Sequence, residues 1–229
     1  MSLASQAIET GEHPPLDDFV FVGESLALDL VNTAIVARGK PRDLLATPAD
    51  LAAWWRHALT HYPDIALVPG IPHSAMDDPA LLAPAKALRA ALRAIFEADI
   101  AGAPVAASDL EILNRILRSG YEAIAIEPGD IPRPQLGSHD TGPDATLLPI
   151  ARSAFDLLTG KDLARLHRCA NERCVLLFYD TTKSATRRWC SVGCMNRARS
   201  LRRYRERKLA VPAPAATSPS SPRRGALDD

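Results

Sequence analysis

Four cysteines, the only ones in this chain of 229 residues, fall in two close pairs. Cys169 and Cys174 are separated by four residues, Cys190 and Cys194 by three, and fifteen residues lie between the pairs. Two such pairs around an insert of hairpin length are typical of a structural zinc site, in which each pair supplies two thiolates. Four sulfur ligands leave no position for a reactive water. The spacing therefore predicts one Zn²⁺ that stabilises the fold.

Disulfides and unrelated buried thiols are the alternatives. The amino-terminal residues lack a basic end followed by an apolar run, so we see no secretory signal and expect a reducing cytoplasm, where disulfides are rare. Scattered core cysteines would not form two tight pairs. His167 lies close to Cys169 in sequence, but four sulfurs already fill the shell, so we expect it at the surface or beside the ligands.

The residues around the cysteines predict a treble-clef-like finger. Residues 175–179 favour a strand, and 187–189 can return as its partner across a polar turn. Ser191 can cap a helix that runs to about residue 208 and carries Cys194 in its first turn. A core this small would barely be stable alone, so metal binding is expected to supply much of the free energy of folding. Three apolar residues are expected to form its core: Phe178, Trp189 and Leu201.

Arginines are concentrated on this predicted helix and just before it. Residues 165–208 hold thirteen Lys or Arg against three acids, a net charge of +10, whereas residues 1–164 carry −10. Such a density of guanidinium groups suits a polyanion, because each neutralised phosphate releases counterions. Contacts with phosphates or bases of double-stranded DNA are expected from six arginines: Arg187, Arg188, Arg197, Arg199, Arg202 and Arg203.

Other interpretations of this charge stay open. The helix could be merely solvated, or it could dock onto the acidic half of its own chain. The polyanion could be RNA, or the finger could be a protein-interaction module that binds an acidic partner. Competition between DNA, RNA and heparin would separate these.

Four short runs resemble the CGNR zinc finger of bacterial proteins: RCANERC at 168–174, F-x-D-T at 178–181, RRWCS at 187–191 and C-x-N-R-A at 194–198. Met195 stands where the family name has glycine, while Asn196 and Arg197 are kept. The change leaves the metal ligands intact, but it removes the residue that best allows close approach of a backbone. The resemblance implies DNA binding.

Two runs near the amino terminus resemble the start of the ABATE domain: GESLALDLVNT at 23–33 and D-L-L-x-T-P-x-D-L-x-x-W at 43–54. In that family the CGNR finger follows an ABATE domain, and the two resemblances occur here in that order. ABATE is described as a candidate stress-induced transcription regulator. The combined resemblance implies a bacterial regulator of the stress response.

The first predicted helix carries a polar stripe. A short strand at 19–22 is followed by a helix from Ser25 to about Arg38, and Ser25, Asp29 and Asn32 share one face of it. Such a stripe is either a ligand site or a buried hydrogen-bond network, and the network is the commoner of the two. We retain Asp29 and Asn32 as candidate ligand-binding residues for a small-molecule effector.

The rest of the large domain is predicted to be helical with one hairpin. Helices are expected after the cap Thr47 and over 79–101, 108–119 and 144–159, and strands over 121–127 and 133–139. Ser108 with Glu111 has the pattern of a capping box. Pro84 requires a place in a first turn or at a kink, and Pro149 requires one in a first turn. The fold class is α+β: a mostly helical N-terminal domain with a small sheet, plus a C-terminal treble-clef-like zinc finger.

Composition divides the chain into four parts: a flexible N-terminus at 1–17, an ABATE-like α+β sensor or dimerisation domain at 18–164, the four-cysteine finger at 165–208 and a disordered tail at 209–229. No apolar run approaches membrane-spanning length. The link between domain and finger is short, so we expect it to be rigid.

Signatures of catalysis are missing: we find no phosphate-cradling glycine loop, no nucleophile elbow and no His-Glu helix for a catalytic metal, and we expect no enzyme. We predict a cytoplasmic transcription regulator. A single finger binds DNA weakly, so a homodimer through the large domain is expected. A large domain that binds a small molecule or acts as an enzyme is the alternative, and it would require a deep pocket near Asp29 and Asn32.

Overall fold

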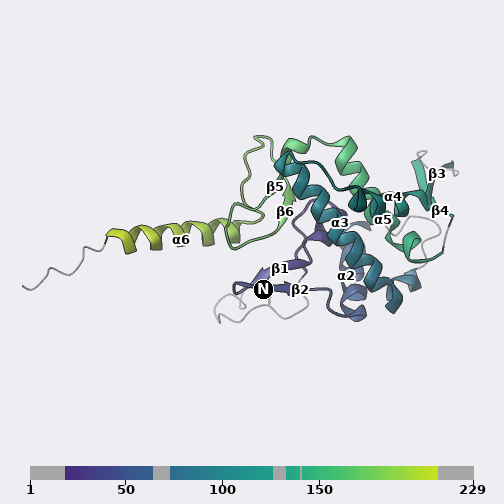
Figure 1. The fold of residues 1–229 in the computed structure, drawn as a ribbon, viewed down its shortest axis with the longest axis horizontal. Helices are drawn as coiled ribbons and strands as arrows, with labels where there is room; N and C mark the ends of the chain where they lie inside the picture. Colours follow the sequence, from purple (N-terminus) through teal and green to yellow (C-terminus); the bar gives the residue numbers. More distant parts are fainter. Residues whose placement is uncertain (1–18, 64–72, 126–132, 140, 211–229) are drawn as a thin grey trace, which may run out of the picture.

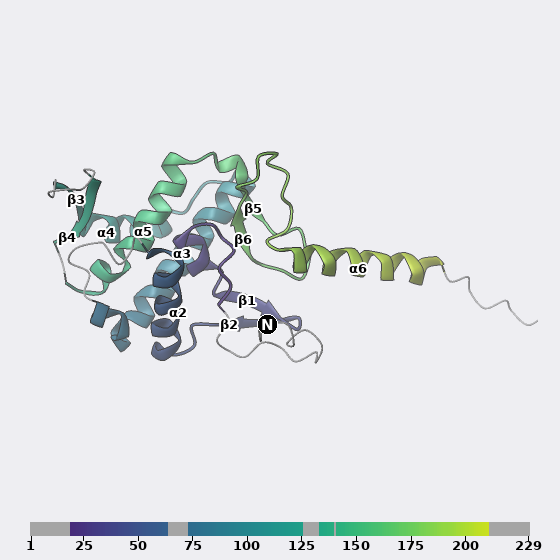
Figure 2. The ribbon, with the colours of Figure 1, turned by 180° about the vertical axis from the view of Figure 1, so that it is seen from behind.

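A computed structural model describes residues 19–63, 73–125, 133–139 and 141–210 of the chain. Figure 1 shows a body of packed helices from which one long helix extends, and Figure 2 shows the same arrangement from behind. The helices are α1 (Leu26–Val31), α2 (Pro48–His61), α3 (Leu82–Ala101), α4 (Ala107–Arg118), α5 (Pro143–Gly160) and α6 (Val192–Ala210), with 3₁₀ turns η3 (His73–Asp77), η4 (Pro79–Leu81) and η5 (Leu163–Arg165).

The strands of the described residues form three antiparallel pairs. These are β1 (Ala34–Ala37) with β2 (Lys40–Asp43), β3 (Gly120–Ala125) with β4 (Arg133–Ser138), and β5 (Leu166–Arg168) with β6 (Leu177–Tyr179). The predicted pairing across 121–139 is confirmed, with Gly120 opposite Ser138; its turn lies outside the described residues. A mostly helical chain with small sheets confirms the predicted α+β class.

Helix α1 lies at the centre of the body. All six of its residues are buried, and it packs against α3 and α5. A helix that is apolar on nearly every side must be covered on every side, which explains the run LALDLV. Trp54 and Trp55 of α2 are also fully buried in this core. The core therefore forms around the segment that carries Asp29.

The predicted helix through Arg38 is too long. Helix α1 ends at Val31, and the chain turns into the β1–β2 hairpin, whose two-residue loop is Arg38 and Gly39 with φ of 51° and 78°. Two positive φ angles are typical of a type I′ turn, which matches the twist of paired strands. The predicted strand at 19–22 is also wrong, because these residues pair with no other strand in the described structure.

A local capping signal placed the start of α2 correctly. Thr47 Oγ1 accepts the Asp50 N–H at 3.2 Å, and the Asp50 carboxylate accepts the Thr47 N–H at 2.8 Å, so a capping box starts α2. The helix predicted over 79–101 is divided into η4 and α3. Pro84 lies in the first turn of α3, as its missing N–H requires.

The helices predicted over 108–119 and 144–159 are present, but two details predicted for their first turns are wrong. Helix α4 begins at Ala107, so Ser108 lies inside its first turn and does not cap it, and Glu111 instead accepts from Arg118 at 2.6 Å. Helix α5 runs from Pro143, which places Pro149 in its interior. Pro149 is buried among apolar neighbours of the core, and this packing offsets the hydrogen bond that the ring removes.

The finger is built onto the body. Leu166, Leu177 and Tyr179, from β5 and β6, belong to the same buried cluster as α1 and α3. The side-chain amide of Asn32 donates to the Leu177 carbonyl at 2.8 Å and accepts the Leu177 N–H at 2.9 Å. Arg93 of α3 connects the two parts as well. Its guanidinium donates to carbonyl oxygens of both: Val31 (2.8 Å), Ala34 (3.3 Å) and Val175 (3.1 Å).

The predicted hairpin of 175–179 with 187–189 is wrong. Strand β6 pairs with β5, which precedes the first cysteine, and residues 187–189 form no strand. The amide of Asn32 already binds the main chain of β6 at Leu177. In the segment 187–189, the Arg188 carbonyl instead accepts a hydrogen bond from the Ala170 N–H, at 2.8 Å.

Replacing Asn32 by Ala should destabilise the whole chain. The substitution leaves the Leu177 N–H and carbonyl buried without partners, so the free energy of unfolding should fall by about 3 kcal/mol. Urea unfolding of the zinc-loaded chain measures this. Thr60→Ala, which removes an exposed hydroxyl bonded to the Arg56 carbonyl, is the control and should change stability by less than about 0.5 kcal/mol. Similar losses in both variants would contradict the role given to Asn32.

Candidate metal centre and basic helix

Two segments bring the cysteines together. Cys169 and Cys174 lie in the knuckle between β5 and β6, Cys190 lies just before α6, and Cys194 lies in its first turn. The four Sγ atoms lie within 4.8 Å of one another, and those of Cys174 and Cys190 are 3.8 Å apart. Tetrahedral Zn–S bonds of about 2.3 Å place sulfurs about 3.8 Å apart, whereas a disulfide needs about 2.05 Å. All four thiols are free, and the arrangement fits a zinc shell.

Main-chain hydrogen bonds shape the knuckle. The Cys169 N–H donates to the Leu176 carbonyl at 2.9 Å, and the Cys174 N–H donates to the Asn171 carbonyl at 2.7 Å. Another main-chain bond, from Ala170 to Arg188, ties the knuckle to the segment that holds the second pair. The ligand positions are therefore fixed by the backbone as well as by the side chains.

Four thiols this close cannot all ionise without a cation. Hydrogen bonds with Cys174 and Cys190 lower the pKa of Cys169, whereas contacts with Cys169 and Cys174, followed by burial, raise the pKa of Cys190. A divalent cation removes this conflict, because it binds all four as thiolates. Arg197 adds positive charge beside the cluster: its guanidinium donates to Cys194 Sγ at 3.4 Å, and this contact raises the pKa of Arg197.

Helix α6 begins as predicted. Ser191 Oγ accepts the Cys194 N–H at 3.2 Å, which caps the first turn. Further along, the Arg205 guanidinium forms two hydrogen bonds to the Glu172 carboxylate, at 2.9 and 2.8 Å, and so joins α6 to the knuckle. Beyond this contact α6 points away from the body in both views. It does not fold back onto the acidic half of the described chain.

The six predicted nucleic-acid contacts differ in their surroundings. Five of the six are exposed to solvent, and four of these make no contact with the cysteines: Arg188, Arg199, Arg202 and Arg203. Arg188 lies over the Trp189 ring, 5.4 Å from its centroid, and Arg202 has a long ion pair to Glu206 at 3.7 Å. Arg197 is exposed but contacts the Cys194 sulfur. The outward arginines are therefore available to an external anion.

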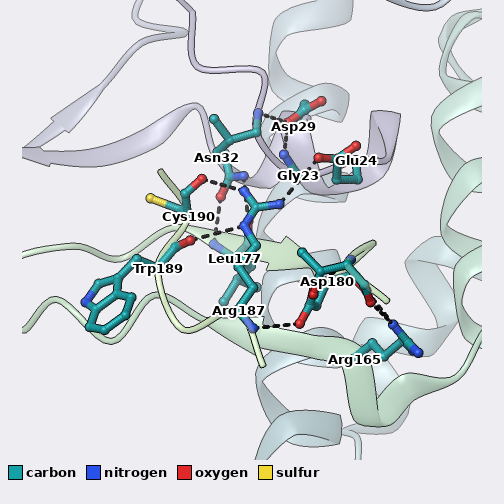
Figure 3. Close-up of polar contacts among 12 residues, drawn as sticks. Gly23, Glu24, Asp29, Asn32, Arg165, Leu177, Asp180, Arg187, Trp189 and Cys190 are labelled. Atoms are coloured by element: carbon teal, nitrogen blue, oxygen red, sulfur yellow. Dashed lines mark hydrogen bonds and ion pairs between the residues drawn. The ribbon is translucent and has the colours of Figure 1, made fainter. Parts of the chain in front are cut away.

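The Arg187 side chain is bound to other residues of this chain (Figure 3). Its guanidinium donates to the carbonyl oxygens of Trp189 (3.1 Å) and Cys190 (2.6 Å) and lies 3.4 Å from the Glu24 carboxylate. It also stacks on Phe178, 4.6 Å from the ring centroid. A nucleic-acid role for Arg187 stays a prediction, and it would require these contacts to be given up.

Asp29 and Asn32 also bond to the chain. Asp29 Oδ1 accepts the N–H groups of Val22 (3.0 Å) and Gly23 (2.7 Å), and the Tyr62 hydroxyl donates to Asp29 Oδ2. Asn32 holds β6, as described above, and both residues are buried. The expected hydrogen-bond network is present. That the two residues also contact an effector stays a prediction.

Comparison with family models gives two matches. ABATE, described as "Putative stress-induced transcription regulator", matches residues 24–161, which is more than half of the chain. The chain belongs to the ABATE family. The CGNR zinc finger matches residues 165–208, and with the clustered cysteines it supports one structural zinc ion. Both resemblances found in the sequence are thereby confirmed. A comparison with curated proteins finds no match.

The two matches meet at η5, so the ABATE domain holds α1 to α5 and the finger holds β5, β6 and α6. Neither family description names an enzymatic activity. Among the helices of the described residues, none is both long and apolar enough to cross a membrane.

Sequence reasoning missed the residues that join the ABATE domain to the finger. The polar stripe predicts a hydrogen-bond network or a ligand contact for Asn32, but not its bond to β6, and no pattern points to Glu24 or Arg93. Glu24 has a φ of 62°, which a side chain rarely adopts, and this conformation places its carboxylate beside Arg187. No spacing or periodicity in the sequence marks these pairs.

The purified chain should carry one zinc ion, and Cys174→Ser should remove it. A serine hydroxyl is a poor substitute for a thiolate, so zinc affinity should fall by more than about 100-fold, with loss of helical signal from α6. Elemental analysis and circular dichroism measure this. His167→Ala is the control and should retain one zinc, because the His167 ring packs on Phe178, 5.7 Å between centroids. Loss of zinc from both variants would contradict the four-sulfur shell, and so would an unaltered chain that carries no zinc.

Stability should fall as pH rises through the titration of Asp29. Burial raises the pKa of Asp29 from 3.8 to about 6, although hydrogen bonds from Tyr62, Gly23 and Val22 lower it in part. Between these values the folded chain binds more protons than the unfolded chain, so the free energy of unfolding decreases with pH. Asp29→Asn stays neutral. The free energy of unfolding of this variant minus that of the unaltered chain should therefore increase by up to about 3 kcal/mol between pH ~4 and ~7.

Urea unfolding at several pH values measures this difference. Because both proteins share the zinc site, its own pH dependence cancels in the comparison. A constant difference between the two proteins would mean that Asp29 titrates at its ordinary pKa in the folded chain.

Proposed function

We propose that the chain is a DNA-binding regulator whose finger places α6 against double-stranded DNA. The observation that carries this proposal is the position of α6: it is fixed at one end by Cys194 and its cap, leaves the body, and exposes arginines along its length (Figure 1). Guanidinium groups bind phosphate oxygens in pairs and read the guanine edge in the same way.

The dimensions of α6 suit the major groove. Its 19 residues give a length of about 28 Å at ~1.5 Å per residue, and a helix with side chains is about 10–12 Å across. The major groove of B-DNA is about 12 Å wide. A helix that stands clear of the body can enter this groove without a collision between the ABATE domain and the backbone.

The distribution of charge supports one orientation. The finger and α6 carry a net charge of +10 and residues 1–164 carry −10. DNA attracts the first part and repels the second, so the field of the whole chain directs α6 towards DNA and keeps the ABATE domain away.

We assign the regulatory part of this function to the ABATE domain, in a cytoplasm that keeps the thiols reduced. An effector that disturbed Asp29 or Asn32 would act on the finger, because Asn32 binds the main chain of β6 and the Gly23 carbonyl accepts the Tyr179 N–H at 3.2 Å. A single α6 offers few base contacts. A homodimer joined through its ABATE domains would present two copies of α6 to the DNA. Sedimentation of the zinc-loaded chain tests whether this dimer forms.

Affinity for a DNA duplex should fall steeply with salt. Contacts from Arg188, Arg199, Arg202 and Arg203 to four phosphates predict a slope of about −4 in a log–log plot between ~50 and ~200 mM salt. Arg203→Gln should weaken binding to all duplex sequences and make the slope shallower by about 1. Fluorescence anisotropy of a labelled duplex measures both quantities.

Arg56→Gln is the matched control, since Arg56 is exposed on α2 of the acidic ABATE domain and should not affect the slope. A flat salt dependence would contradict a phosphate interface. Displacement of the duplex by an acidic polypeptide at equal ionic strength would favour a protein-interaction finger, and stronger binding of an RNA duplex would favour RNA.

A further inference from the structure

A hollow lies between the knuckle and the base of α6, beside the metal centre. Its volume is about 380 Å³, within the range of roughly 300–1,000 Å³ that small-ligand sites occupy. Trp189 lines it together with Ala198 and Leu201, and charged side chains from the knuckle and the helix complete the lining. The hollow thus combines apolar and cationic surface.

The indole of Trp189 offers a stacking surface. It is half-buried, and the Arg188 guanidinium lies over its ring at 5.4 Å from the centroid. Its Nε1 is buried and makes no hydrogen bond to the described residues. A half-buried indole that lines the hollow and already holds one planar cation over its ring suits a flat ligand that can stack on it.

Two arginines of α6 with few contacts of their own border the hollow. Arg199 and Arg202 lie one turn apart on α6; Arg199 has no ion pair with the described residues, and Arg202 has only the long contact of 3.7 Å to Glu206. The carboxylate that lines the hollow, Glu172, is neutralised by the two hydrogen bonds from Arg205. Because this pair connects the knuckle to α6, it also fixes the width of the hollow.

We propose that this hollow binds an unpaired nucleotide of a DNA strand, with the base against Trp189 and the phosphate between Arg199 and Arg202. The inference rests on the proposed function only in taking DNA as the partner. An aromatic platform beside guanidinium groups is how proteins hold single strands, whereas a base inside a duplex has no free face to offer. An acidic peptide would satisfy the arginines but not the indole.

Tryptophan fluorescence of the full zinc-loaded chain tests the proposal. Trp54 and Trp55 are fully buried, so a change in emission on adding a ligand reports on Trp189. A single-stranded DNA of about 12 nucleotides should quench the emission saturably. The same sequence as a duplex, the same sequence as RNA, and polyglutamate at equal ionic strength are the comparison ligands.

Paired substitutions on α6 distinguish binding in the hollow from attraction by the overall positive charge of the helix. Arg199→Gln with Arg202→Gln should weaken single-strand binding about tenfold more than Arg203→Gln with Arg207→Gln, which removes the same charge from residues that do not line the hollow. Trp189→Phe should retain most of the affinity, and Trp189→Leu should lose about tenfold. Zinc content and circular dichroism verify folding, and if Trp189→Leu does not fold, the arginine pairs decide the result.

Equal losses in the two arginine pairs, or equal quenching by polyglutamate, would overturn the proposal. Tighter binding of the RNA strand would overturn the assignment to DNA. If the duplex binds, and the substitutions in the hollow do not weaken binding of the single strand more than their controls do, only this inference fails. If neither form of DNA binds, the proposed function fails with it.

Discussion

Four sulfur atoms gathered within 4.8 Å determine the geometry of the finger. They come from two segments, and the last ligand, Cys194, lies in the first turn of α6, so the coordination of the metal also sets the direction of the helix. The buried cluster around them is small and includes only Leu176 and Phe178 besides three of the cysteines. Such a core cannot hold a fold alone, and the free energy of metal binding becomes free energy of folding.

A second constraint joins this finger to the ABATE domain. Asn32 completes the hydrogen bonds of β6, Arg93 binds carbonyl oxygens at the end of α1 and in the finger, and Arg187 connects Glu24 to the carbonyl of a metal ligand. The contacts of Asn32 and Arg93 are buried or half-buried, so breaking one leaves polar groups without partners, whereas the Arg187–Glu24 pair is exposed. The finger is therefore an extension of the body's core, and a few hydrogen bonds connect the two ends of α1 to the segments that carry the cysteines.

The separation of charge gives this assembly a direction. An acidic body carries a basic helix, and α6 extends away from the helices of the ABATE domain (Figure 2). Near the metal centre the charges are instead used locally: Arg197 contacts a sulfur, Arg205 pairs with Glu172, and Arg187 binds carbonyl oxygens. Only the arginines without such partners remain for an external polyanion.

The sequence by itself determined the features whose partners lie a few residues apart. The cysteine spacing gave the metal ligands, and the caps at Thr47 and Ser191 gave the starts of α2 and α6, because a capping side chain bonds to a backbone group three residues on. Tertiary structure alone decided the length of α1, the partner of β6 and the inward position of Arg187. Those depend on pairs such as Asn32 with Leu177 and Glu24 with Arg187, 145 and 163 positions apart. Contacts over such separations leave no spacing or period in the sequence, because they exist only once the core has formed.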